Sequence, residues 1–255
     1  MDFWIPILLG VIQGITEFLP ISSSGHLVVC EYFFGLRGDF LFLNILLHIA
    51  TLFAVTIYYR KTIWYLITHP FCKTNIYLII ATIPAVLFVL IFHKFVNNTM
   101  NNILFVGIGF LLTAFFLTIA VYISKKNTNP QPLNYKSSFI MGVSQALAIF
   151  PGLSRSGTTL SFGLVAGAEH QTALDFSFLM SIPIIIASLV YELIFADFST
   201  AFVDINIMGT IIAFFSAFLT AILGLFLMKK IIKNMNLIYF VPYLVIVGFL
   251  TIIFA

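Results

Sequence analysis

The chain has 255 residues, of which 61% are hydrophobic and only 8% are charged. A soluble domain carries about 25% charged residues, so this composition excludes an ordinary soluble protein and indicates one that lies in a lipid bilayer. The formal net charge of +3 is small, and we expect no nucleic-acid partner. Cys30 and Cys72 lack the spacing of a metal or redox motif and are interpreted as buried small residues.

The first predicted element, residues 1–38, is apolar but is interrupted by the polar stretch GITEFLPISSSGH at residues 14–26. Residues 3–18 favour a helix, Pro20 prevents its smooth continuation, and three serines precede a second helical stretch that starts at His26. A connection that happens to be polar is one interpretation of this stretch, and an active site is the other.

Three long apolar segments follow, and each approaches the roughly 20 residues that cross about 30 Å of hydrocarbon. They cover residues 40–59, 76–93 and 103–123. His48 and Asn44 lie one turn apart within the first of these segments. We interpret them as a hydrogen-bonded pair between helices, with a pocket-lining role for His48 as the alternative.

The second half of the chain repeats this order. Residues 138–170 contain the polar stretch PGLSRSG, and three further spans are predicted at residues 172–195, 206–228 and 237–255. Four ionisable residues beside the first of these spans are interpreted as interfacial or solvated, namely Glu169, His170, Asp175 and Glu192.

The connections between spans differ in charge. Lysine and arginine gather in three of them, at residues 60–73, 124–137 and 229–233. The positive-inside rule places these three connections in the cytoplasm. The connection at 196–205 carries Asp197 and Asp204 without a basic residue, as expected for an outer connection.

This charge pattern fixes how often the chain crosses the membrane. With three spans on each side of the central basic connection, residues 1–38 must enter and leave on the outer side and residues 138–170 on the inner side. We therefore predict an all-α polytopic membrane protein with six transmembrane helices and two re-entrant helical hairpins. Both chain termini are expected outside the cell membrane.

The two predicted hairpins resemble each other in sequence. An ungapped alignment of residues 10–26 with residues 142–158 matches seven of seventeen positions, where chance gives about one or two. Because each copy precedes three spans, an odd number, the second copy begins on the opposite face, which is an inverted-topology repeat. We expect one integral membrane domain over 1–255, made of repeat 1 (1–123), a cytoplasmic connection (124–137) and repeat 2 (138–255).

The polar residues of the two hairpins suit an anionic ligand. A helix that begins inside the membrane presents unpaired N–H groups and the positive end of its dipole, which favour an anion. Arg155 adds a planar fork that matches phosphate oxygens. The predicted phosphate-binding residues are Ser22, Ser24, Ser154, Arg155, Ser156 and Gly157.

The first hairpin also carries groups for a metal and for proton transfer. Gln13 and Glu17 lie four residues apart and project from one face of a helix. Their hard oxygens suit a divalent cation, Mg²⁺ or Ca²⁺. His26 can exchange protons near neutral pH, and one of the serine hydroxyls can attack a phosphorus atom.

Each of these residues also has a structural interpretation. Serines at a helix start are commonly caps, and Arg155 can serve as a topology determinant or as a structural partner of Glu17. A functional site is favoured because the carboxylate, the serines, the histidine and the arginine all fall within the two duplicated breaks: Glu17 and His26 in the first, Arg155 in the second.

The two motifs resemble those of the undecaprenyl-pyrophosphate phosphatase family, the bacitracin-resistance type. Its first signature is met by Gln13, Glu17 and FLPISSSGH, and its second, PG-x-SRSG, is met at residues 151–157. The segment FSFLMSIP at 176–183 is also similar to the family, so the resemblance covers essentially the whole chain. Gln13 stands where a second glutamate is common, which leaves one carboxylate fewer for the metal.

The resemblance implies an activity. Family members use a divalent cation to remove the terminal phosphate from a C55 polyprenyl diphosphate at the outer face of the cell membrane. This reaction recycles the lipid carrier of cell-wall synthesis and lowers sensitivity to bacitracin. It implies four catalytic residues, with Glu17 engaging the metal beside Gln13, Arg155 binding phosphates, His26 in proton transfer, and Ser23 as nucleophile or phosphate ligand.

The expected partners are the polyprenyl diphosphate and membrane lipids, and a homodimer is left open. The rival interpretation is a polyprenyl-phosphate flippase or transporter, because inverted repeats with broken helices are also a transporter design. A non-catalytic polyprenyl-phosphate binding protein is the third.

Overall fold

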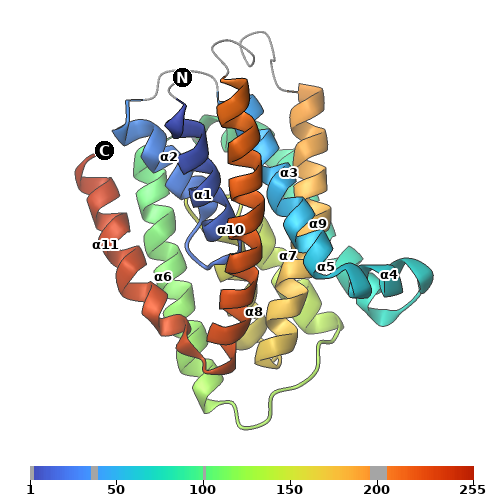
Figure 1. Ribbon diagram of the computed structural model, residues 1–255. Coiled ribbons are helices and arrows are strands. Elements are labelled where there is room, and N and C mark those ends of the chain that lie inside the picture. Colours follow the sequence, from blue (N-terminus) through green and yellow to red (C-terminus); the bar gives the residue numbers. More distant parts are fainter. Residues whose placement is uncertain (1–2, 36–39, 100–101, 196–205) are drawn as a thin grey trace.

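The computed structural model describes residues 3–35, 40–99, 102–195 and 206–255, which form a bundle of helices (Figure 1). Within these ranges the regular elements are helices, apart from one isolated backbone bridge between Gln131 and Ala168. Asp197 and Asp204, predicted on an outer connection, lie outside the described residues.

Among the described residues, six segments are long and apolar enough to cross a membrane. They are α3 (Leu41–Tyr58), the Lys73–Phe92 part of α5 (Lys73–Thr99), α6 (Ile103–Lys126), α9 (His170–Phe195), α10 (Ile207–Lys233), and η1 (Asn236–Tyr239) with α11 (Phe240–Ile253). The predicted number and positions of the candidate spans are thus confirmed.

Four shorter helices form two consecutive pairs. They are α1 (Trp4–Phe18), α2 (Ser23–Phe33), α7 (Tyr135–Leu147) and α8 (Arg155–Val165). At 11 to 15 residues each, they are too short to cross about 30 Å of hydrocarbon alone. In Figure 1 the first pair lies in the upper half near both chain termini, whereas α8 lies in the lower half.

One short helix was not predicted. The segment that the sequence analysis treated as a basic connection contains α4 (Arg60–Thr68), which projects to the side of the bundle (Figure 1). Only Leu66 of this helix is buried, while Trp64 and Ile67 are exposed. Its apolar residues are consecutive, at 63–67, so they show no helical period that would separate this helix from a loop.

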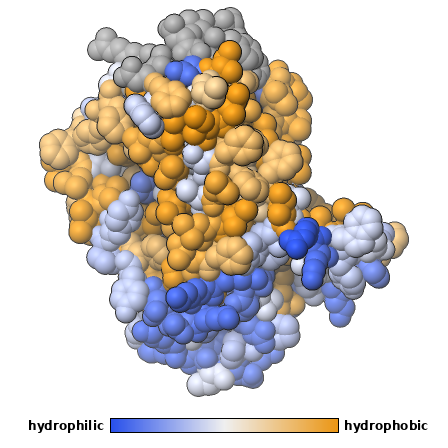
Figure 2. Space-filling view, viewed as in Figure 1, coloured by the Kyte–Doolittle hydropathy of each residue, from blue (hydrophilic) through white to orange (hydrophobic). Residues whose placement is uncertain are grey.

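The basic residues gather toward one end of the bundle. Lys125 and Lys126 lie in the last turn of α6, and Lys230 and Lys233 in the last turn of α10. Both helices end in the lower part of Figure 1, which is the hydrophilic part of the face seen in Figure 2 below a broad hydrophobic band. This separation is typical of a protein that spans a bilayer.

Asp175 is held more firmly than a solvated charge. It accepts a hydrogen bond from the Tyr59 hydroxyl at 2.5 Å and pairs with Lys229 at 3.0 Å. These contacts join the junction of α3 and α4 to α9 and α10 near the basic end.

Glycines let the short helices approach the spans closely. A Cβ atom at Gly10 or Gly14 of α1 would collide with the backbone of Ala213 or Ala217 in α10. In the second pair, a Cβ at Gly142 of α7 would lie 2.6 Å from the Cα atom of Ala81 in α5. Small residues at such crossings allow backbone-to-backbone packing within a membrane.

Candidate active site

The connections within the two short-helix pairs meet inside the bundle. The Ser156 hydroxyl of α8 donates a hydrogen bond to the backbone carbonyl of Leu19, in the connection 19–22, at 2.9 Å. The Ser154 amide donates to the Thr113 hydroxyl of α6 at 3.0 Å. These bonds fix residues far apart in the sequence against each other and against a span.

The tip of the second connection, residues 148–154 between α7 and α8, is pressed onto α6. Gly152 has a φ of +75°, which favours glycine, and a Cβ atom there would collide with the carbonyl group of Val106. A Cβ at Gly109 would likewise collide with the Pro151 carbonyl. The sequence PGLS therefore makes a turn that only glycine at 152 fits.

Glu17 is the centre of the polar contacts between the two connections. Its Oε2 atom accepts hydrogen bonds from Gln13 Nε2 at 3.0 Å and from the Ser23 hydroxyl at 2.5 Å. Its Oε1 atom pairs with Arg155 Nη2 at 2.6 Å, and the Arg155 and Glu17 side chains are 15% and 6% exposed. The structural pairing that the sequence left as an alternative is present, and it lies inside the candidate site.

Both second helices of the pairs begin at a serine cap. The Ser22 hydroxyl accepts from the Gly25 amide at 3.3 Å, and the Ser154 hydroxyl accepts from the Gly157 amide at 3.1 Å. Ser22 has a φ of +69°, an uncommon value for a residue other than glycine. Such backbone strain is concentrated at functional sites in proteins.

A pocket of about 190 Å³ lies where these elements meet. Predicted site residues from both short-helix pairs line it, namely Glu17, Ser22, Ser23, Ser24, Ser154 and Arg155. Gln13 does not line the pocket but donates a hydrogen bond to Glu17, which does. Ser156 and Gly157 are buried and do not line it either. Arg155 Nη1 is buried and has no hydrogen-bond partner among the described residues.

Beyond the predicted site residues, four polar residues line the pocket. They are His48 of α3, Gln145 of α7, and Ser188 and Glu192 of α9. For His48 the pocket-lining alternative is correct; its Nδ1 atom contacts the Asn44 carbonyl of its own helix at 2.8 Å. Gln145 had a usable signal, because it aligns with Gln13 in the repeat, whereas Glu192 resembled an interfacial residue.

His26 lies beside this pocket and is not among its lining residues. Its Nδ1 atom contacts the carbonyl of Ser22 at 2.6 Å, and its Nε2 atom contacts the hydroxyl of Tyr243 in α11 at 2.7 Å. The two rings are parallel, with centroids 5.8 Å apart. Tyr243 was missed, because a tyrosine within an apolar span has no distinguishing pattern.

The oxygen atoms near Glu17 are of the kind that a hard divalent cation prefers. Gln13 Oε1 is buried without a hydrogen-bond partner among the described residues, one turn from the Glu17 carboxylate. No group of three His, Cys, Asp or Glu side chains in the described ranges is arranged to hold a metal ion. Mg²⁺ commonly uses one or two carboxylates and completes its shell with waters and substrate phosphates, which matches this sparse donor set.

The chain is similar to known proteins over its whole length. A family model described as "Bacitracin resistance protein BacA" matches residues 6–250. An "Undecaprenyl-diphosphatase" from Christiangramia forsetii is 35% identical, over 100% of this chain and 99% of the relative. A protein of the same name from Thermosipho melanesiensis is 37% identical over 95% of each chain. "Undecaprenyl-diphosphatase 4" from Bacillus thuringiensis (strain Al Hakam) is 45% identical over 74% of this chain and 73% of the relative.

Proposed function

We propose a function from the premise that these similarities establish: the chain belongs to the bacitracin resistance protein BacA family. It is an undecaprenyl-diphosphatase, a membrane hydrolase that converts undecaprenyl diphosphate to undecaprenyl phosphate and inorganic phosphate. This reaction recycles the lipid carrier of cell-wall synthesis and lowers sensitivity to bacitracin. The observation that supports it most is the 2.6 Å contact between Glu17 and Arg155, which joins two distant motifs in one polar pocket.

Residues at both connections supply hydrogen-bond donors to a diphosphate in the pocket. The N-terminal turns of α2 and α8 start at Ser22 and Ser154, which line the pocket, so their N–H groups and dipoles favour anionic oxygens there. The unpaired Nη1 atom of Arg155 is available for a phosphate oxygen. Ser24 adds a hydroxyl, while Ser156 and Gly157 hold the second turn in position.

Ser23 is the proposed nucleophile. Its hydroxyl donates to Glu17 Oε2 at 2.5 Å, which leaves the oxygen lone pairs for the terminal phosphorus. When the Ser23 oxygen bonds to phosphorus, its proton passes to Glu17, and the bond from phosphorus to the bridging oxygen breaks. Undecaprenyl phosphate leaves, and water then hydrolyses the phosphoserine to release inorganic phosphate.

His26 is the proposed proton-transfer group. Its ring lies one turn into α2, and its two nitrogens contact Ser22 and the Tyr243 hydroxyl. Because Nδ1 is held by the Ser22 backbone carbonyl, Nε2 is the nitrogen that can exchange a proton, and its partner is the Tyr243 hydroxyl.

A divalent cation, Mg²⁺ or Ca²⁺, would be held by Glu17 with Gln13 beside it. When bound, it would neutralise charge on the diphosphate. The Arg155 guanidinium already lies on Glu17, so we expect little affinity for the cation before the diphosphate arrives. Gln13→Ala should therefore raise the cation concentration for half-maximal phosphate release, while Gln131→Ala, in an exposed connection, should not.

We also propose that each short-helix pair is a re-entrant hairpin and that the two halves form an inverted repeat. Support comes from reciprocal packing, since α1 packs on α10 and its counterpart α7 packs on α5, through the aligned glycines Gly10 and Gly142. The pocket then faces the outer side, with both termini outside. A cysteine at position 128 (Thr128→Cys, with Cys30 and Cys72 replaced) that reacts with an impermeant label from outside the cell would contradict this topology.

Proteoliposomes distinguish the phosphatase from a flippase. With undecaprenyl diphosphate and Mg²⁺, the wild type should release inorganic phosphate, and Ser23→Ala and Arg155→Ala should release at least a hundredfold less. Movement of the lipid between leaflets without phosphate release would replace the enzyme with a transporter. Binding with neither activity would leave a binding protein.

A further inference from the structure

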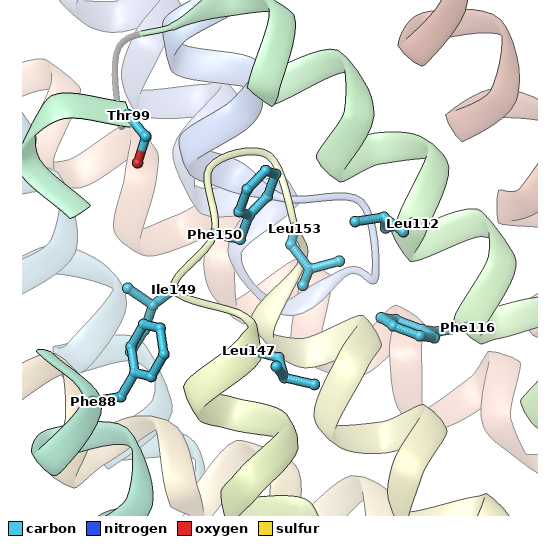
Figure 3. A pocket seen from close by; sticks show the side chains of 8 residues that line it. All are labelled: Phe88, Thr99, Leu112, Phe116, Leu147, Ile149, Phe150 and Leu153. Atoms are coloured by element: carbon cyan, nitrogen blue, oxygen red, sulfur yellow. The ribbon is translucent and has the colours of Figure 1, made fainter. Parts of the chain in front are cut away.

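An apolar pocket of about 210 Å³ lies beside the second connection, between α5 and α6 (Figure 3). Seven of its eight lining residues carry apolar side chains. Phe88 comes from α5, Leu112 and Phe116 from α6, and Leu147 from the end of α7. Figure 3 shows Ile149 and Leu153 of the connection facing the same space.

The second connection separates an apolar side from a polar side. Ile149 and Leu153 line both this apolar pocket and the polar pocket that contains Glu17 and Arg155. Leu153 is followed directly by Ser154, whose hydroxyl caps α8 at the polar pocket. A molecule with an anionic head and an apolar tail can therefore place the head on one side of this turn and the tail on the other.

The two α6 residues that line the apolar pocket lie near the middle of that candidate span. Leu112 and Phe116 lie 9 and 13 residues after the start of the 24-residue α6, which is about 14 and 20 Å along a helix about 36 Å long. Leu112 and Leu147 are both exposed, and Leu112 lies on the candidate span α6, where an exposed apolar side chain contacts lipid. The pocket is therefore open sideways to hydrocarbon, where a lipid tail resides before and after the reaction.

From this arrangement we propose that the apolar pocket binds the isoprene units next to the diphosphate of the lipid substrate. The proposal rests on the proposed function and adds the place of the tail. An apolar cavity of about 150 Å³ holds benzene, with its six carbons, so this pocket holds one or two five-carbon isoprene units. The remainder of the tail leaves between α5 and α6 into the bilayer.

Tryptophan substitutions that fill the pocket test this placement. Leu112→Trp and Leu147→Trp lie at its exposed rim, and Leu219→Trp is a matched control on α10, where Leu219 is 64% exposed. Phosphate release is measured with undecaprenyl diphosphate and with methyl diphosphate, which has the same reacting group and no isoprene unit.

The two rim variants should lower kcat/KM for undecaprenyl diphosphate at least tenfold, mainly through KM, and change it less than twofold for methyl diphosphate. The control should match wild type on both substrates. Unchanged kcat/KM on undecaprenyl diphosphate, or equal losses on both substrates, would overturn the tail site. A wild type that releases phosphate from neither substrate would refute the proposed function instead.

Photocrosslinking tests the tail site without catalysis. With p-benzoylphenylalanine at position 112, 147 or 219 in liposomes, undecaprenyl phosphate should form adducts at 112 and 147 but not at 219. Phospholipid adducts at 112 and 147 should fall when undecaprenyl phosphate is added, and adducts that the added lipid does not displace would overturn the proposal.

Discussion

The Glu17–Arg155 ion pair couples the two connections, so removing its partners singly and together should give non-additive losses of stability. The atoms lie 2.6 Å apart, and the Arg155 and Glu17 side chains are 15% and 6% exposed. Removing one partner of a buried pair leaves an uncompensated charge, which costs about 3–5 kcal/mol. Each kcal/mol corresponds to about 2–4 °C in Tm for a chain of this size, so Glu17→Gln and Arg155→Met should each unfold on the order of 10 °C below wild type.

The double variant should recover more than half of either single loss, because neither buried charge remains. Thermal unfolding in detergent measures this cycle, and phosphate release should be lost in all three variants. Glu169→Gln is the control, since Glu169 is exposed, and its effect should stay within about 0.5 kcal/mol. If the double variant loses as much stability as the sum of the single variants, the two side chains are not coupled and this description of the site is wrong.

Three further variants probe the parts around this pair. Gly152→Ala should lower both Tm and phosphate release, because the added Cβ collides with Val106. Gly167→Ala, also at positive φ but with its nearest neighbour 3.7 Å away, should lower Tm less, and equal losses of Tm would exclude the close approach as the cause. Ser156→Ala should lower the unfolding free energy by about 1 kcal/mol more than Ser161→Ala, because the Ser156 hydroxyl bonds to the Leu19 carbonyl whereas the buried Ser161 hydroxyl has no partner among the described residues. Equal losses would show that the bond to Leu19 does not stabilise the fold. Tyr243→Phe removes the hydroxyl that contacts His26, so it should lower kcat about threefold to tenfold and change the pH profile of kcat. Tyr239→Phe, at an exposed side chain, should change neither, and an unaltered profile in Tyr243→Phe would argue against His26 in proton transfer.

The spans were predictable because a bilayer imposes a length and an apolar composition that six segments meet. The breaks at Pro20 and Pro151 were predictable from the proline chemistry and from the sequence repeat. The helix α4 was not, because its short stretch of apolar residues between basic ones does not distinguish a surface helix from a loop.

The site was partly predictable for a related reason. Residues within the two repeated motifs, such as Glu17 and Arg155, could be placed in the site because the motif itself marks the break between two short helices. His48 and Glu192 reach the pocket from spans whose rotation about their axes is decided by packing against other helices. The sequence of one span does not determine that rotation, so both residues resembled ordinary polar positions.

Phosphate release in detergent tests the central claim most directly, because without a membrane no transport can contribute to the signal. We predict that the purified chain liberates inorganic phosphate from undecaprenyl diphosphate with Mg²⁺ or Ca²⁺. Glu17→Ala, in the first motif, and Arg155→Ala, in the second, should each abolish it. A folded wild-type protein that binds the lipid and liberates no phosphate with either cation would contradict the account, as would full activity in either variant.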